Sequence, residues 1–202
     1  FGKSLFLDTL KEAFEGNKVL FAGLYLENNW DWEKKHPVIR IDFGGGQLRH
    51  ASELDQKITE ILNEHTDKFS ILFKNESISG KFRELIMALE KKYSQKVVIL
   101  VDEYDKPILD NITEKEIARG MRDGLRNLYS VIKAADAYIK FVFITGVSKF
   151  SKINLFSGLN NLKDITLDNR YGSICGYTEN ELSYFEERLI DVNREELKLW
   201  YN

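Results

Sequence analysis

An unbroken apolar run that ends abruptly in two carboxylates constrains the fold of this chain more than any other feature. Residues 97–101 are all apolar and mostly β-branched, and Asp102 and Glu103 follow them directly. Such a run suits a strand that is buried on both faces, as in a parallel sheet covered by helices. The pattern therefore predicts an α/β architecture with two acids at the carboxyl edge of its sheet.

The rest of the chain alternates between strand and helix patterns. Residues 38–43, which are β-branched and rich in apolar residues between Pro37 and Gly44, form a predicted strand, as do the apolar residues 141–145 before Gly146. Residues 164–167 are a candidate edge strand. Apolar residues at helical spacing predict helices at 5–14, 54–62, 82–89, 117–132 and, behind a Thr178–Glu181 capping box, 182–189. Strands separated by helices favour a three-layer α/β domain with a mostly parallel sheet.

Composition excludes several classes of function. Hydrophobic residues make up 43% of the chain and charged residues 30%, which is typical of a globular protein, and the net charge of -3 gives no basic excess for nucleic-acid binding. The single cysteine, Cys175, cannot form an internal disulfide, which indicates a reducing, cytoplasmic compartment. No apolar run approaches the roughly 20 residues that span a bilayer. We expect one domain over residues 1–202, truncated at both ends, with no membrane partner.

Asp102 and Glu103 are the first candidates for chemistry. Open α/β sheets bind ligands at the carboxyl ends of their strands. In a nucleotide hydrolase, Asp102 would hold Mg²⁺, usually through water, and Glu103 would orient or deprotonate the attacking water. The alternative is that the strand simply leaves the core through polar residues, and the pair alone leaves both interpretations open.

Gly2, Lys3 and Ser4 are the second candidates. They match the last three positions of the phosphate-loop pattern G-x-x-x-x-G-K-[ST], in which backbone N–H groups cradle phosphates, Lys reaches the β- and γ-phosphates and Ser ligates Mg²⁺. A bare triplet also arises by chance, but a helix pattern starts at this one, as the motif requires. Together with Asp102 at a strand end, the triplet predicts a P-loop nucleotide site.

Polar residues after the 141–145 strand supply the third candidates. Thr145 and Ser148 follow the strand on either side of Gly146 and Val147. A polar side chain there would lie beside the two acids and would sense the γ-phosphate or position water. A strand cap followed by a turn explains the same residues equally well.

These segments together resemble the predicted AAA-ATPase-like family of bacteria and archaea. The likeness runs along the whole chain and rests on FGKS (1–4), VVILVDEYDKP (97–107), FVFITGVSKFS (141–151), FSGLNNL (156–162), DIT (164–166) and GYTENEL (176–182). The resemblance implies a P-loop NTPase domain that uses ATP and Mg²⁺. It also implies that Gly2, Lys3 and Ser4 end the phosphate loop. In the same way, Asp102 and Glu103 match the Walker B acids, and Thr145 or Ser148 falls at the sensor position.

The chain departs from that family at both ends. Family members have a strand and an Arg/Pro-rich loop before Phe-Gly-Lys-Ser, and a PD-(D/E)XK nuclease-like domain usually follows the ATPase-like region. The resemblance therefore implies that the first strand, which would be central in the sheet, and most of the phosphate loop are absent from this chain. It further implies that the longer protein binds ATP whereas this piece does not.

Two functions follow. The first is an Mg²⁺-dependent ATPase-like module, in which Lys3 neutralises the β- and γ-phosphates while Ser4 and Asp102 hold Mg²⁺. In that module Glu103 positions water and Thr145 reads the γ-phosphate. The alternative is a degenerate or nucleotide-regulated interaction module that controls an attached nuclease-like effector.

Overall fold

A parallel sheet of three strands organises the fold. β1 (Val38–Asp42), β2 (Val97–Asp102) and β3 (Ile139–Ile144) pair in that order, so β2 lies in the middle. Every residue of β2 is buried, as the unbroken apolar run predicts. All three predicted strands are confirmed, and the register places Asp42 opposite Asp102 at the carboxyl ends of β1 and β2.

The computed structural model describes residues 2–147, 155–156, 162–176, 178, 181 and 193. The chain divides into two compact units, Lys3–Leu162 and a smaller one of Phe1–Gly2 with Lys163–Asn202. The sheet belongs to the larger unit. Within the described residues, no helix is long and apolar enough to cross a membrane.

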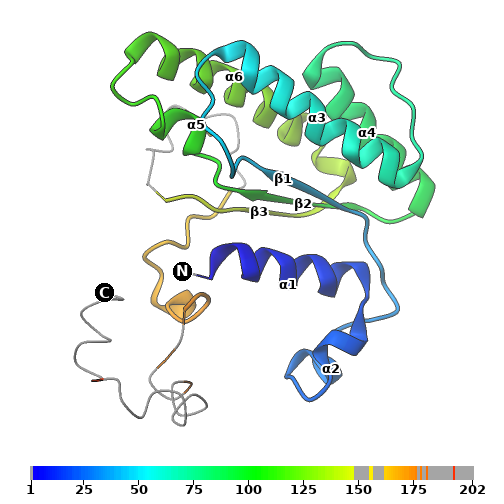
Figure 1. The fold of residues 1–202 in the computed structure, drawn as a ribbon. Helices are drawn as coiled ribbons and strands as arrows, with labels where there is room; N and C mark the ends of the chain where they lie inside the picture. The colour runs from blue at the N-terminus through cyan, green and yellow to red at the C-terminus, as the bar shows by residue number, and fades with distance from the viewer. Residues whose placement is uncertain are drawn as a thin grey trace. The chain divides into compact units, whose positions relative to one another are not determined.

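Helices cover both faces of the sheet (Figure 1). α1 (Lys3–Glu15) lies against one face, and α3 (Ala51–Phe69), α4 (Ile78–Tyr93) and α6 (Lys115–Ala134) lie against the other. Short helical turns complete the connections: η1 (Lys18–Phe21), α2 (Leu26–Asn29), α5 (Lys106–Leu109) and η2 (Asp136–Tyr138). The predicted three-layer α/β arrangement with a parallel sheet is confirmed for this unit.

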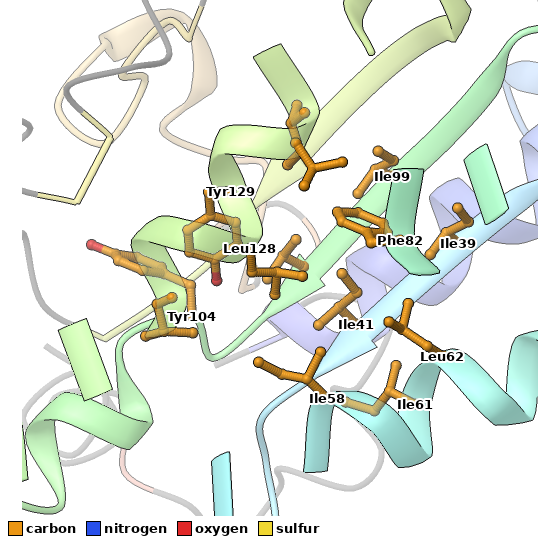
Figure 2. Close-up of a cluster of buried hydrophobic side chains, with 14 of the residues drawn as sticks. Ile39, Ile41, Ile58, Ile61, Leu62, Phe82, Ile99, Tyr104, Leu128 and Tyr129 are labelled. Atoms are coloured by element: carbon orange, nitrogen blue, oxygen red, sulfur yellow. The ribbon is translucent and has the colours of Figure 1, made fainter. Parts of the chain in front are cut away.

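Alternation along the strands divides the core into two clusters. The larger cluster fills the space between the sheet and α3, α4 and α6, where Ile39, Ile41 and Ile99 point toward the helices (Figure 2). The smaller cluster packs α1 against the opposite face and consists of Leu7, Phe14, Val38, Val98 and Leu100. Because successive side chains of a strand point to opposite faces, the unbroken apolar run at residues 97–101 of β2 supplies both clusters.

Replacing Leu100 with Ala tests the smaller cluster. The side chain is fully buried, so its loss leaves a cavity beneath α1 and lowers the free energy of unfolding by about 2–4 kcal/mol. Urea unfolding followed by circular dichroism measures the change. Leu72→Ala is the matched control, because Leu72 is 89% exposed and its replacement is expected to change stability by less than about 0.5 kcal/mol. Equal stabilities for the two variants would contradict the two-sided packing of β2.

A histidine from α3 closes the outer edge of β1. His65 Nε2 lies 2.8 Å from the carbonyl oxygen of Arg40 and 3.2 Å from its backbone nitrogen. In one tautomer the ring donates to the oxygen, and in the other it accepts from the N–H. Burial lowers the pKa of His65, which favours the neutral ring. The contact occupies backbone groups through which another strand would pair.

The buried imidazole predicts a pH dependence of stability. Because the pKa of His65 is lower in the folded than in the unfolded chain, the unfolded chain binds more protons as the pH falls through about 6.5. This site therefore makes the unfolding free energy fall by up to about 1.4 kcal/mol per pH unit below that value. Urea unfolding at several pH values between 7.5 and 5.5 measures the slope. His65→Gln is expected to flatten it, whereas the exposed control His50→Gln leaves it unchanged. An unaltered slope in His65→Gln would count against the assignment.

The predicted edge strand at 164–167 is wrong. The Asp164 carboxylate accepts the backbone N–H of Thr166 at 3.0 Å, and the N–H of Asp168 donates to the carbonyl of Ile165 at 3.1 Å. These local bonds fold the backbone into turns instead of a ladder. The turns lead into η3 (Asn169–Tyr171) of the smaller unit.

One of the two hydrogen bonds of the predicted capping box is confirmed, the one in which the Glu181 side chain accepts from the backbone of Thr178. The Glu181 carboxylate accepts the backbone N–H of Thr178 at 2.6 Å and its hydroxyl at 2.7 Å. The helix predicted at 182–189 lies outside the described residues.

The leading strand implied by the family resemblance stays a prediction. The three strands pair without a gap between them, so a further strand joins only at an outer edge of the sheet. His65 occupies that edge of β1, whereas nothing in the described part of the chain forms a ladder with the outer edge of β3.

Candidate functional site

The direction of α1 brings its first turn to the carboxyl edge of the sheet. The Phe6 and Phe143 ring centroids lie 5.4 Å apart, and those of Phe14 and Phe141 lie 5.5 Å apart. α1 therefore runs antiparallel to β3, and the first turn of α1 lies toward the carboxyl ends of the strands. Lys3 and Ser4, the first residues of α1, consequently lie toward the same edge as Asp102.

Asp102 ends the middle strand with partners at both carboxylate oxygens. The residue is 1% exposed. Its Oδ1 accepts the Thr145 hydroxyl at 2.6 Å and the backbone N–H of Glu103 at 3.1 Å. Its Oδ2 lies 3.8 Å from a guanidinium nitrogen of Arg40. A carboxylate so far removed from water needs such partners, and here they also fix its orientation.

Thr145 and Asp102 are thus two predicted site residues that the structure brings together. Thr145 directly follows β3, and its backbone N–H donates to the carbonyl of Val101 at 2.8 Å, which continues the pairing with β2. Its hydroxyl is committed to Asp102. The γ-phosphate role of Thr145 stays a prediction, and Ser148 lies outside the described residues.

Glu103 adopts a backbone conformation that is uncommon for its residue type. Its φ is 50°, in the left-handed region, which costs a non-glycine residue roughly 1–2 kcal/mol. Its side chain extends toward the turn after β1, because a Cβ added to Gly44 would lie 3.5 Å from Glu103 Oε2 and 2.9 Å from Asp42 Oδ1. Carboxylates from the ends of β1 and β2 therefore lie near one another, and backbone strain of this kind clusters at functional sites.

A second buried acid, Asp105, ties the turn after β2 to the turn after β3. The Asp105 side chain is fully buried and accepts the backbone N–H of Val147 at 2.9 and 3.2 Å from its two oxygens. The backbone N–H of Tyr104 donates to the carbonyl of Thr145 at 3.0 Å. Gly146 lies so close that an added Cβ would be 2.4 Å from Tyr104 Cε1. These contacts hold Thr145 beside Asp102.

Sequence reasoning missed Arg40, which is a further charged residue of the site. Its guanidinium pairs with Asp8 of α1 and lies 3.5 Å from Asp42 Oδ2, besides its approach to Asp102. The available signal was a charged residue between the apolar Ile39 and Ile41 in a predicted strand. Asp105 was missed as well, because its distance of three residues from Asp102 matches no sequence motif considered for this chain.

The oxygen groups at this edge are of a chemical type that Mg²⁺ binds. Among the described residues, no cluster of three or more His, Cys, Asp or Glu side chains is placed to hold a metal ion. Mg²⁺ usually keeps several waters and uses one or two protein oxygens together with substrate phosphates. Asp102 and the exposed hydroxyl-bearing Ser4 are donors of the required type.

Replacing Thr145 with Val tests the hydroxyl contact. The variant keeps the side-chain shape but removes one donor from a buried carboxylate, and the unfolding free energy is expected to fall by about 1–3 kcal/mol. Thr145→Ser retains the hydroxyl and is expected to lose clearly less. Urea unfolding of the two variants beside the parent measures the difference. If the two variants unfold at the same urea concentration, the hydrogen bond does not support Asp102.

Comparison with known proteins adds a family and a relative. A family model described as predicted AAA-ATPase matches residues 1–156, which contain α1, all three strands and the acids at their ends. The uncharacterized protein in the vnfD 5' region of Azotobacter chroococcum mcd 1 is 53% identical over 203 residues, covering 100% of this chain. The chain spans 39% of that protein's length. No solved structure matches the chain.

Proposed function

Because the chain belongs to the family of predicted AAA-ATPases, we propose that it is an ATP-binding, Mg²⁺-dependent ATPase module with a P-loop NTPase type of site. One observation carries the proposal. The buried Asp102 ends the middle strand of a parallel sheet, held by Thr145, at the edge toward which the first turn of α1 is directed. Open α/β sheets bind ligands at this edge.

The start of α1 is the proposed phosphate site. A helix N-terminus offers unpaired N–H groups and the positive end of the helix dipole to an anion. Lys3 adds a full positive charge at this point and would neutralise the β- and γ-phosphates. Gly2 has a φ of 85°, a conformation that favours glycine. It belongs to the smaller unit, so its part in the phosphate loop rests on the sequence motif.

Ser4 and Asp102 would hold Mg²⁺, the former by its hydroxyl and the latter through water. When bound, the ion offsets negative charge on the phosphates during transfer. Thr145 and the Glu103 backbone N–H orient the Asp102 carboxylate for this task. These two partners occupy Oδ1, whereas Oδ2 lies 3.8 Å from the Arg40 guanidinium.

Glu103 is the proposed positioning group for the attacking water. It follows Asp102 directly, and its side chain extends from the end of β2 toward the turn after β1. A carboxylate beside the phosphate site would orient water or accept its proton. Thr145 or Ser148 would report the presence of the γ-phosphate.

Replacing Glu103 with Gln and Lys3 with Ala tests these roles separately. Glu103→Gln is expected to retain ATP binding and to lose hydrolysis by about 100-fold or more, because the amide cannot accept the proton. Lys3→Ala is expected to lose binding itself. Calorimetry and a phosphate-release assay measure the two quantities in a chain extended by the upstream strand that the family resemblance implies, because this piece alone is expected not to bind ATP. The unextended chain is measured beside it.

The exposed residues Glu116 and Lys91 supply matched controls. Glu116→Gln and Lys91→Ala remove the same charges elsewhere on the surface and are expected to change neither quantity. Equal turnover in Glu103→Gln and the parent would refute the assignment of Glu103. Tight ATP binding without turnover in the parent would instead favour the nucleotide-regulated interaction module.

A further inference from the structure

Arg40 is a charged residue in the middle of β1 that the proposed reaction does not use. Its side chain is 26% exposed and lies between carboxylates of three different elements. They belong to Asp8 of α1, Asp42 of β1 and Asp102 of β2. Arg40 therefore links the helix that carries Lys3 and Ser4 to the strand that carries the proposed Mg²⁺-binding acid.

The position of Asp8 makes this link relevant to the phosphate site. Asp8 lies four residues after Ser4 in the same helix, so the two residues are about one turn apart on one face of α1. A contact that fixes Asp8 consequently fixes both the rotation of α1 and the direction of its first turn. The same guanidinium lies 3.8 Å from the Oδ2 of Asp102, whereas Thr145 and the Glu103 N–H bind Oδ1.

Electrostatics give the link its strength. One cation lies among three carboxylates, of which Asp102 is buried whereas Asp8 and Asp42 are about half exposed. Water therefore screens the attraction to Asp102 least. The planar guanidinium offers several donors in a fixed fork, which an ammonium group cannot reproduce. Arg40 Nε is buried without a hydrogen-bond partner within the described residues. We therefore attribute the position of the side chain to its attraction to the three acids.

We propose that Arg40 is a positioning residue of the nucleotide site, which couples the phosphate-binding end of α1 to the metal-binding acid Asp102 through Asp8. This role rests on the proposed ATPase function. Without the contacts of Arg40 with Asp8 and Asp102, the distance between the first turn of α1 and the Asp102 carboxylate would vary. Because the proposed Mg²⁺ site uses Ser4 directly and Asp102 through water, the apparent affinity for Mg²⁺ in the presence of ATP reports that separation.

A double-mutant cycle tests the coupling. Arg40→Gln and Asp8→Asn are each expected to raise the Mg²⁺ concentration for half-maximal ATP hydrolysis by about tenfold. The double variant is expected to be no worse than either single variant, since both remove the same link. Arg40→Lys keeps the charge but not the fork and is expected to recover stability more fully than Mg²⁺ affinity. If Arg40→Gln does not fold, the Mg²⁺ dependence of ATP hydrolysis is measured with Arg40→Lys instead.

The surface pair of Lys34 and Asp31, 2.7 Å apart, supplies a control cycle. Lys34→Gln and Asp31→Asn are expected to leave the Mg²⁺ dependence unchanged. Additive effects in the Arg40 and Asp8 cycle, or lower stability with unaltered Mg²⁺ dependence, would overturn the positioning role while the parent still hydrolyses ATP. Absence of ATP binding by the parent chain, with and without the upstream strand, would instead overturn the proposed function and this role with it.

Discussion

The removal of one carboxylate from water is the constraint on which the rest of this site depends. Asp102 is 1% exposed at the end of a strand that is buried throughout, and a bare carboxylate in that place would be strongly destabilising. The Thr145 hydroxyl, the Glu103 N–H and the Arg40 guanidinium offset this cost. They come from the turn after β3, the turn after β2 and the middle of β1. The Asp102 carboxylate thus holds these three segments together.

The two-sided burial of β2 explains why a helix start reaches the same edge. An entirely apolar strand needs cover on both faces, and α1 supplies it on one of them through Leu7 and Phe14. Stacking of Phe14 on Phe141 and the edge contact of Phe6 with Phe143 set the direction of that helix. The apolar packing that stabilises the fold thereby directs the end of α1 that carries Lys3 and Ser4 toward the acids. Folding and the candidate chemistry depend on the same contacts.

The sequence predicts the elements well where local pattern decides them. The apolar runs at 97–101 and 141–145 both predict strands, and the first is buried throughout whereas the second is only partly buried. The end of the first run at residue 101 places the two acids at the carboxyl end of β2. The hydrophobic pattern does not predict the structure where a side chain forms a hydrogen bond with nearby backbone. Asp164 does so in the segment that was wrongly predicted to be a strand. The pattern also fails for Arg40, because its partner Asp8 lies 32 residues away, and only the packing of α1 on the sheet brings them together. Asp105 is similar, since its bond to Val147 spans 42 residues.

The central claim is that the start of α1 and the end of β2 form one nucleotide site. A crystal structure with Mg²⁺ and a non-hydrolysable ATP analogue, of a chain extended by the upstream residues that the family resemblance implies, tests it most directly. The account predicts the β- and γ-phosphates against the first turn of α1, beside Lys3, with Asp102 and Glu103 facing the γ-phosphate. Nucleotide bound elsewhere on the molecule, with Asp102 remote from the phosphates, would contradict it.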